Sequence, residues 1–554
     1  MSFLHPRVVA EIEAAPHRPS RKPLLASRRG QALVVVLLAL LTFVLSLINL
    51  GSRDLWLDEA TSVHLSRRFF QDFPNLTDIN MTLYYAALAA WLAIGGGAEN
   101  ELFLRLPSAL AGALTVPVLF GLVRRISGPN AAALAAALLA TNAFFIRYAQ
   151  EARGYSLVTL LATVATWLFL EGLRRRSWRV WAAYAVVSTA ALYTHFFVAF
   201  VLVAHLSAAP FIIGGPAIRT RLQRMATLFR LRAPVDAVRA SALLPSGAVL
   251  ATIAMGILAL PVIAATGDRG TCQIAYLQPP EAMHVSAALR GIAGDATIAG
   301  PRDPDLSFLG PAMLVAMAAA VLLALLSAGR RVLPRNALLL VAWVVVPFGA
   351  ALVVSYFLVP IFAWRYLVVI VPGLAGLMAC LVVQIRPAVL RAATALVLLS
   401  LGLASVLAWH RQPVAEPWSD VVANVTSRST LADGIVFMTT SARKPFQYYA
   451  RQQGSIPDMP IEVGVPKAGC DGEPELSAAT AADLGPDHHA RLWLVVAHVG
   501  EDTANAQLRD AVLARIHANY REVDRTQWIF KPGSQHNIEV RLYETRVPIA
   551  SSPP

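Results

Sequence analysis

Long apolar runs, separated by short breaks rich in Arg and Pro, fill the chain up to about residue 409. A helix that crosses a bilayer needs roughly 20 apolar residues. Runs of this length predict a polytopic helical membrane protein rather than a globular core. We expect eleven spans, at 31–50, 107–123, 130–148, 156–172, 180–195, 197–213, 246–265, 307–328, 337–358, 366–384 and 390–408.

The Arg residues in the breaks test this threading, because cytoplasmic loops carry an excess of Lys and Arg. If the N-terminus is cytoplasmic, every Arg cluster between spans falls on that side. These clusters contain Arg124, Arg125, Arg174, Arg175, Arg176, Arg179, Arg219, Arg221, Arg224, Arg230, Arg232, Arg239, Arg330, Arg331, Arg335, Arg386 and Arg391. The outer side then receives 53–106, the turns at 150–155, 195 and 359–365, the segment 267–306, and the chain from 410 onward.

Two apolar stretches are assigned by loop parity rather than by hydropathy. Counting 81–96 as a span would reverse every later loop, so we interpret it as a short interfacial helix. Its Tyr84, Tyr85 and Trp91 suit the headgroup level. The stretch 180–213 is too long for one span, and we expect a tight hairpin that turns near Thr194 and His195.

The chain from residue 410 onward has a different pattern. Plausible strands at 434–438, 492–496 and 538–543 alternate with plausible helices at 445–453 and 504–520. This pattern predicts a small α/β domain. The predicted organisation is a basic cytoplasmic tail (1–30), a transmembrane domain (31–409) with an outer loop (51–106), and an extracytoplasmic α/β domain (410–554).

Composition supports a membrane protein. The chain is 56% hydrophobic and 15% charged, with mean hydropathy +0.56, whereas a soluble protein carries about 25% charge. The net charge of +13 comes from Arg residues between apolar runs, so we expect the lipid bilayer and not nucleic acid as partner. The first run is too long for a signal peptide and is interpreted as an uncleaved anchor. Cys272 and Cys470 both fall on the outer side, either bonded or as separate thiols.

Two adjacent carboxylates, Asp58 and Glu59, follow the first span. Carboxylates beside a membrane are costly unless they are solvated, paired or functional. In the functional interpretation, Asp58 is a general base for an acceptor hydroxyl, because a partly desolvated carboxylate has a raised pKa. Glu59 then orients Asp58 or binds a cation. The alternative is a helix-capping pair or a solvated loop acid.

Further polar and cationic side chains lie at the outer ends of several spans. Arg guanidinium groups there can bind a phosphate through paired hydrogen bonds, and a His can hold a phosphate oxygen or move a proton. The alternatives are snorkelling arginines, an aromatic belt and a solvated interfacial His. The residues are Arg53, Arg105, Gln150, Glu151, Arg153, Tyr155, His195, Arg365 and Tyr366.

The sequence lacks the usual signatures of soluble enzymes. It contains no P-loop, no Gly-rich dinucleotide fingerprint, no HExxH and no GxSxG. A reaction driven by a bound nucleotide therefore has no visible binding motif.

The order of these motifs resembles the GT-C superfamily of membrane glycosyltransferases, in the branch of the protein O-mannosyltransferases and the lipid A aminoarabinose transferase. No single motif is specific, but the resemblance covers nearly the whole chain. The matching segments are Trp56-Leu57-Asp58-Glu59, Leu83-Tyr84-Tyr85, Arg105-Leu106-Pro107-Ser108, 150–155, Tyr193-Thr194-His195, Arg365-Tyr366, Trp418-Ser419-Asp420, 432–436 and Tyr448-Tyr449.

The resemblance implies an enzyme that moves a sugar from a polyprenyl-phosphate carrier to a glycan, lipid or protein acceptor. It implies Asp58 as catalytic base, supported by Glu59, with Tyr84, Tyr85 and the cationic residues around the donor. A divalent cation is left open. The implied location is a bacterial inner membrane, with the C-terminal domain in the periplasm. One departure is that 78–82 lacks the family's cation before Leu-Tyr-Tyr, so an Arg must replace it.

Two alternatives belong to other classes. A transporter or flippase of lipid-linked sugar would more often show charged or broken helices at mid-membrane, and paired repeats. A non-catalytic assembly subunit would bind a partner through its C-terminal domain. The polar residues of this chain gather at one interface, which favours chemistry there.

Overall fold

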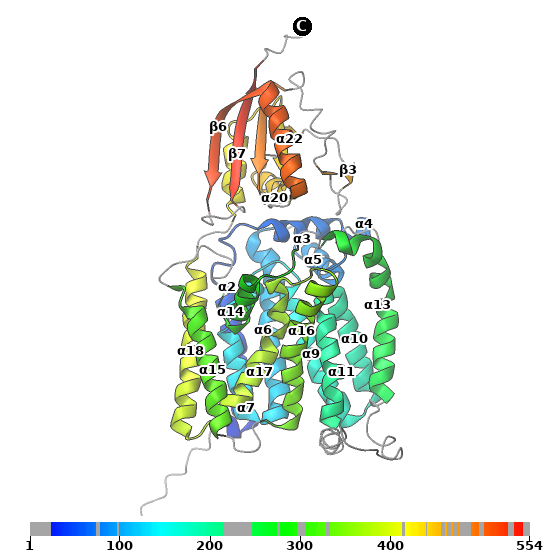
Figure 1. Ribbon diagram of the computed structural model, residues 1–554, viewed down its shortest axis with the longest axis vertical. Helices are drawn as coiled ribbons and strands as arrows, with labels where there is room; N and C mark the ends of the chain where they lie inside the picture. Colours follow the sequence, from blue (N-terminus) through cyan, green and yellow to red (C-terminus); the bar gives the residue numbers. More distant parts are fainter. Residues whose placement is uncertain are drawn as a thin grey trace, which may run out of the picture.

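A computed structural model describes the chain over most of its length. The described residues are 24–73, 78–96, 99–213, 246–273, 277–295, 306–327, 333–412, 416–438, 440–455, 460–462, 467–468, 474–475, 489–497, 503–529 and 537–546. A bundle of long helices forms the body, and a small sheet domain stands on one end of it (Figure 1). The predicted fold class, a polytopic helical protein with a C-terminal α/β part, is confirmed.

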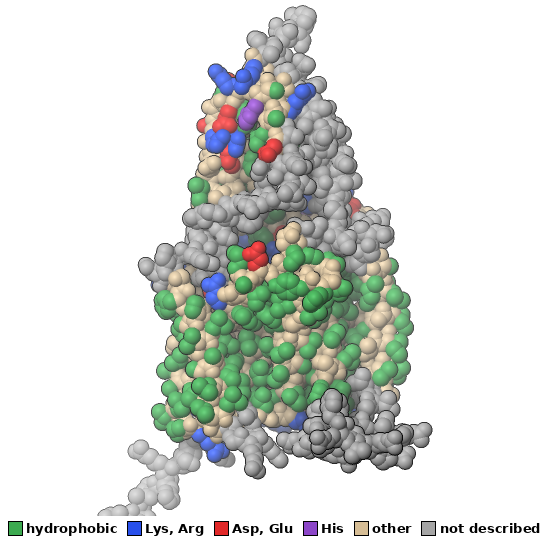
Figure 2. Space-filling model, in the orientation of Figure 1, with side chains coloured by type: hydrophobic (Ala, Val, Ile, Leu, Met, Phe, Trp, Pro, Cys, Tyr) green, Lys and Arg blue, Asp and Glu red, His purple; other side chains and the backbone are tan. Residues whose placement is uncertain are grey.

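Within the described ranges, nine helices are long and apolar enough to cross a membrane. They are α2 (Arg28–Leu47), α6 (Glu101–Ser127), α9 (Tyr155–Arg175), η2 with α11 (Phe196–Val198, Ala199–Ile213), α13 (Ser246–Gln273), α15 (Leu309–Ser327), η6 with α16 (Arg335–Ala337, Leu338–Phe357), η7 with α17 (Trp364–Ile370, Val371–Val382) and α18 (Ala388–His410). The visible face of this body is covered largely by hydrophobic side chains (Figure 2).

Two further helices, α7 (Pro129–Ala140) and α8 (Ala143–Ala149), are long and apolar enough to cross a membrane only when taken together, and they are bent by 63°. Asn142 makes the break. Its Oδ1 accepts the backbone N–H of Phe145 at 2.9 Å and so caps α8, while its Nδ2 donates to the carbonyl of Ile292 at 3.1 Å. An Asn that caps a new helix start ends the preceding one. The predicted span 130–148 is therefore a broken one.

The two parity assignments have clear structural counterparts. The stretch 81–96 forms α5 (Thr82–Ile94), a helix of 13 residues, and it packs against α3. The hairpin prediction is confirmed, because α10 (Trp178–Thr194) ends one residue before His195 and η2 begins one residue after it. With 17 residues, α10 is about 26 Å long. It is shorter than the helices counted as spans and corresponds to the eleventh predicted span.

The Arg-rich ends of α6 and α9 lie together around one acid. Glu171 forms an ion pair with Arg125, with Nε 3.2 Å from Oε1, and its Oε2 accepts a hydrogen bond from Arg175 Nε at 2.6 Å. Figure 1 places this end of the bundle opposite the sheet domain. The two clusters therefore share one side, as loop parity predicts. The compartment that each side faces stays a prediction.

The C-terminal part is a five-stranded mixed sheet with helices on both faces. Strands run in the order β2-β1-β5-β7-β6, with β1 parallel to β2 and β5 and the remaining pairs antiparallel. The elements are α19 (Trp418–Thr426), β1 (Gly434–Met438), η8 (Thr440–Ala442), α20 (Arg443–Gln452), β2 (Ile461–Glu462), β3 (Lys467–Ala468), β4 (Pro474–Glu475), β5 (Arg491–Val496), α22 (Thr503–Asn519), β6 (Tyr520–Trp528) and β7 (Ile538–Thr545).

Alternation along β1 divides the core of this domain. Ile435 and Phe437 belong to a cluster of buried residues that continues through Trp418 into the helical bundle. Val436 faces the opposite side and packs in a separate cluster with Val512 of α22. Because successive strand residues point to opposite faces, one face of the sheet contacts α22 and the other is continuous with the membrane body. The sheet domain is thus packed onto the outer loop by apolar contact.

Candidate functional site

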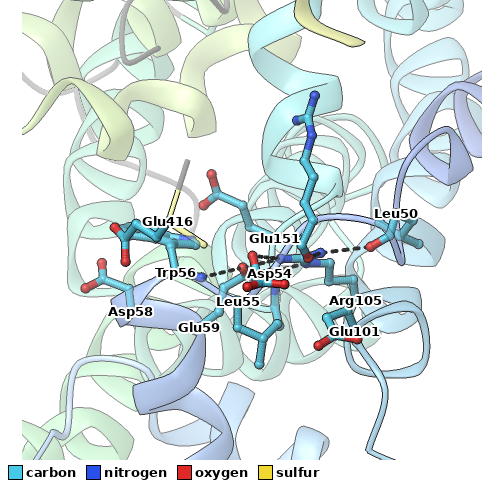
Figure 3. A network of polar contacts seen from close by, with 12 residues as sticks. Leu50, Asp54, Leu55, Trp56, Asp58, Glu59, Glu101, Arg105, Glu151 and Glu416 are labelled. Atoms are coloured by element: carbon cyan, nitrogen blue, oxygen red, sulfur yellow. Dashed lines mark hydrogen bonds and ion pairs between the residues drawn. The ribbon is translucent and has the colours of Figure 1, made fainter. Parts of the chain in front are cut away.

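The two acids begin a helix that lies across the outer end of the bundle. That helix is α3 (Leu57–Arg67), followed by α4 (Phe69–Asp72). Asp58 and Glu59 occupy its first turn, where the helix dipole stabilises negative charge. Their environments differ, since the Asp58 side chain is 24% exposed and that of Glu59 only 1%. In Figure 3 their carboxylates occupy separate places, with Glu59 next to Arg105.

Glu59 forms a buried, two-pronged ion pair with Arg105 of α6. Arg105 Nε lies 2.7 Å from Glu59 Oε1, and Arg105 Nη2 lies 2.6 Å from Oε2. Glu59 Oε1 also accepts the backbone N–H of Ala152 at 2.7 Å. The remaining Arg105 hydrogen bonds go to the carbonyls of Leu50 at 2.8 Å, Arg53 at 2.7 Å and Asp54 at 3.0 Å. The pair therefore joins α3, α6 and the outer loop. The N–H groups of Arg105 are already hydrogen-bonded to other protein atoms.

Two other arginines converge on Asp58. Arg153 Nη2 and Arg365 Nη1 each lie 3.8 Å from Asp58 Oδ2, which is beyond direct hydrogen bonding. Arg153 is anchored from behind, because its Nη1 donates to Ser62 Oγ at 3.1 Å and to the carbonyl of Asp58 at 3.2 Å. Its Nε is buried without a hydrogen-bond partner among the described residues. Two guanidiniums close to one part-exposed carboxylate form a site suited to an additional anion.

Tyr155, His195 and Tyr366 line the same site. The ring of His195 lies 4.6 Å from that of Tyr366 and 5.8 Å from that of Tyr155, centroid to centroid. His195 Nδ1 accepts the N–H of Phe197 at 3.2 Å, which assigns the ring proton to Nε2. Burial, with Arg153 and Arg365 nearby, lowers the pKa of His195 to about 3. His195 is therefore a neutral donor, and its Nε2 has no partner within the described part of the chain.

Tyr85 supports Arg153 from α5. Its hydroxyl lies 2.5 Å from Asp78 Oδ2 and 3.5 Å from Arg153 Nη1. Burial, and then the charge of Asp78, raise the pKa of Tyr85, so the phenol stays protonated and donates to Asp78. Tyr84 is buried beside it. Asp78, in the segment that departs from the family pattern, was not predicted as a site residue, and its acidic charge near Arg153 is visible only in the fold.

Gln150 and Arg53 have structural contacts at the ends of α2 and α18. Gln150 Nε2 donates to the carbonyls of Ser46 at 3.0 Å and Ile48 at 2.6 Å, and its Oε1 accepts Trp409 Nε1 at 2.6 Å. Arg53 donates to the carbonyl of Trp409 at 3.1 Å and stacks on its ring at 4.5 Å. Burial, then Arg105 and Arg147, lower the pKa of Arg53 to about 10. Binding of a lipid-phosphate sugar by Gln150 and Arg53 stays a prediction.

Arg147, which sequence reasoning missed, faces Glu151. Its Nε lies 3.4 Å from Glu151 Oε1, and its guanidinium lies over the rings of Trp364 at 5.1 Å and Trp409 at 5.0 Å. The spacing of four residues between Arg147 and Glu151 is visible in the sequence, although Glu151 lies just past the end of α8 at Ala149. Burial raises the pKa of Glu151 to about 7, against the opposing effect of Arg147. Glu151 is thus the acid of this region that titrates near neutrality.

Replacing Glu151 by Gln should remove a pH dependence of stability. Because burial raises the pKa of Glu151 to about 7 from 4.5, the folded state holds this proton more tightly. The contribution to stability is complete below about pH 4.5 and is lost as pH rises towards 7, by up to about 3 kcal/mol. Unfolding in detergent between pH 4 and 8 measures this. An equal pH slope in wild type and variant would contradict it.

The surroundings of Asp58 fit an anion better than a cation. Arginines face it, and no group of three or more His, Cys, Asp or Glu side chains suited to a metal occurs in the described ranges. The divalent cation left open by the sequence stays a prediction. The pairing considered for Cys272 and Cys470 falls on side chains outside the described residues.

Comparisons with known proteins find one matching family model and several similar folds. Residues 80–232 match the family model described as dolichyl-phosphate-mannose-protein mannosyltransferase. The fold is similar to apo ArnT from Cupriavidus metallidurans, with TM-score 0.55 and 13% identity over 93% of this chain and 98% of that one. It is also similar to the apo oligosaccharyltransferase of Archaeoglobus fulgidus, with TM-score 0.52 and 13% identity over 92% and 76%. No curated protein matches the chain in sequence.

The chain shares the fold of these solved structures, and the family model matches less than a third of its length. The matched segment contains Arg105, Arg153 and His195, whereas Asp58 and Arg365 lie outside it. The structure brings Asp58 and Arg365 to the matched residues.

Proposed function

We propose that this protein transfers a sugar from a polyprenyl-phosphate carrier to an acceptor hydroxyl, with Asp58 as general base. The observation that carries this proposal is the convergence of Arg153 and Arg365, each 3.8 Å away, on the part-exposed carboxylate of Asp58. The neutral His195 beside them adds an unused N–H donor. A second structure of ArnT from Cupriavidus metallidurans, bound to undecaprenyl phosphate, is similar in fold (TM-score 0.52, 12% identity, 95% of this chain and 100% of that one), which supports a lipid-phosphate donor.

The geometry supports an ordered use of these charges. In this structure, the two guanidiniums lie near Asp58 without a direct hydrogen bond to it. The phosphodiester of a polyprenyl-phosphate sugar carries one negative charge and gains a second as the sugar leaves, so it competes with Asp58 for both guanidiniums. When Arg153 and Arg365 turn to the phosphate, the Asp58 carboxylate becomes available as a base.

The proposed reaction is a single displacement. The acceptor oxygen attacks the anomeric carbon as Asp58 takes the hydroxyl proton, and the bond from that carbon to the phosphate oxygen breaks. The electron pair stays on the phosphate oxygen, where guanidiniums and the His195 N–H stabilise the developing charge. Configuration at the anomeric carbon is inverted. The energy comes from the sugar phosphate itself, so no nucleotide is required.

The protein is proposed to act at the outer face of a bacterial inner membrane. The support is the positive-inside rule, since the Arg-rich ends of α6 and α9 lie at the end opposite the site. One experiment can identify the sugar, the carrier and the acceptor. Purified protein in sealed vesicles is supplied with a panel of polyprenyl-phosphate sugars on either side of the membrane. Transfer from the side of the sheet domain is expected. Uptake without transfer would contradict the proposal and favour the transporter alternative.

Replacing Arg365 should weaken donor use. Hydrogen bonds to charged groups contribute about 1.5–3 kcal/mol, so Arg365→Met should lower kcat/KM for the donor by about 10- to 100-fold. Arg365→Lys keeps the charge but loses the planar fork and should fall in between. Initial rates at varied donor concentration measure both variants.

Arg335→Met is the matched control, because Arg335 is an exposed arginine that donates to the carbonyl of Phe211 in another part of the bundle. It should keep wild-type rates. Equal kcat/KM in the Arg365 variants and the wild type would refute a phosphate role for Arg365.

A further inference from the structure

At the boundary between the sheet domain and the outer loop, two helices have N-cap residues whose side chains cannot accept a hydrogen bond. Within α3, Glu59 Oε2 accepts only the N–H of the N-cap residue Trp56 itself, at 3.4 Å. The N-cap residue of α3 is Trp56, whose indole can only donate a hydrogen bond. The N-cap residue of α19 is Pro417, which has no polar side chain. The first N–H groups of a helix have no partner inside it and normally bond to a Ser, Thr, Asp or Asn at the cap. Both helix starts therefore need acceptors from elsewhere.

Each helix is capped by an acid that lies just before the start of the other helix: Glu416 caps α3, and Asp54 caps α19. Glu416, which is 5% exposed, accepts the N–H of Leu57 at 3.1 Å and the indole N–H of Trp418 at 2.8 Å, both at Oε2. Asp54 Oδ2 accepts both the N–H and the hydroxyl of Ser419 at 2.7 Å. The capping is reciprocal across the boundary, between positions more than 350 residues apart.

A tyrosine of α20 adds a third contact to the same segment. The Tyr449 hydroxyl accepts the N–H of Leu55 at 2.7 Å and donates to Glu101 Oε1 at 2.9 Å. Asp54, Leu55 and Leu57 are thus all bound by the C-terminal part of the chain, directly before Asp58. Figure 3 shows Glu416 beside Trp56 at the start of this helix.

We propose that Glu416 is a positioning residue of the catalytic centre and that the C-terminal domain, through it, fixes the orientation of Asp58. This inference rests on the proposed role of Asp58 as base. Glu416 touches no reacting atom, and it acts by holding the first N–H of α3. The second fixed point is the pairing of Glu59 with Arg105 on the membrane side. With one end of the turn released, Asp58 loses its fixed place between Arg153 and Arg365, and a displacement of about 1 Å costs about 100-fold in rate.

Two substitutions of Glu416 separate position from charge. Glu416→Gln keeps a carbonyl oxygen that can accept both N–H groups, whereas Glu416→Ala leaves both without a partner. We expect Glu416→Ala to lower kcat by about 10- to 100-fold with the KM for the sugar donor within about twofold, because Arg153 keeps its hydrogen bond to Ser62 Oγ. Glu416→Gln should stay within about threefold of wild type. Near-wild-type kcat in Glu416→Gln would show that Glu416 acts by accepting hydrogen bonds at the helix start and not through its negative charge.

Hydrogen–deuterium exchange provides a readout that does not depend on activity. Amides of 55–62 should exchange faster in Glu416→Ala than in wild type and remain protected in Glu416→Gln. Gln452→Ala is the matched control, because Gln452 joins the same domain to the carbonyl of Glu99 at 2.5 Å without contacting residues 54–57. It should change neither kcat nor this exchange.

Wild-type kcat and exchange in Glu416→Ala would overturn the inference while the proposed function stands. If the wild type transfers no sugar, the proposed function fails, and unchanged exchange at 55–62 in Glu416→Ala would still overturn the cap. If Glu416→Ala does not fold, Asp54→Ala tests the reciprocal half. It should speed exchange at 418–423 and lower kcat, and wild-type values for both would refute the reciprocal cap.

Discussion

Replacing Asp58 by Asn should lower kcat by about 10²- to 10⁴-fold, the range attributed to a positioned general base. The amide has nearly the shape of the carboxylate but cannot take the acceptor proton. Asp58 is the part-exposed acid to which Arg153 and Arg365 converge, so its loss should affect chemistry rather than folding. Single-turnover transfer with saturating donor measures the chemical step, and a melting curve in detergent checks that the variant is folded.

Asp72→Asn is the matched control for this substitution. Asp72 lies on α4, close in sequence to Asp58, and forms an exposed ion pair with Arg68 at 3.0 Å. It should turn over at the wild-type rate. Turnover by Asp58→Asn equal to that of Asp72→Asn would exclude Asp58 as the base.

Replacing Arg105 by Met should have the largest effect on stability. The change leaves Glu59 charged and buried and removes the donors from the carbonyls of Leu50, Arg53 and Asp54. Breaking a buried ion pair from one side costs about 3–5 kcal/mol. Chemical unfolding in detergent at pH 7 measures the loss, with Arg68→Met of the exposed Arg68–Asp72 pair as control at about 0–1 kcal/mol. Equal losses in the two variants would mean that the buried pair contributes no more than a surface pair.

The helical body could be read from the sequence because length and hydropathy of a span are local properties. Loop parity correctly assigned the turn at His195 and the short helix α5, which hydropathy alone would not have done. The sheet domain was predicted in part. Strand β6 was missed because its residues, Tyr520–Trp528, are mostly polar. It lies at the edge of the sheet, where every second side chain is exposed. Helix α19 was missed because it lacks a cap residue of its own.

The sequence predicted which residues belong to the candidate site but not how they are arranged. Motif order brought together Asp58, Arg153, His195 and Arg365, and the structure places all four around one point. Arg147, Asp78 and Glu416 were not predicted, since each acts through a contact with a residue that the motifs already contain. Apart from the four-residue spacing of Arg147 and Glu151, their own sequence surroundings carry little signal of those contacts.

The sequence by itself predicted a multi-span membrane protein that resembles a known superfamily, with an acid pair after the first span. Only the tertiary structure decided which partners each acid of the pair has. Neighbouring positions on a helix point about 100° apart, so Glu59 turns inward to Arg105 while Asp58 faces Arg153 and Arg365. These partners and the cap from Glu416 lie far away in the chain, and such contacts are set by packing, which leaves no periodic pattern in the sequence.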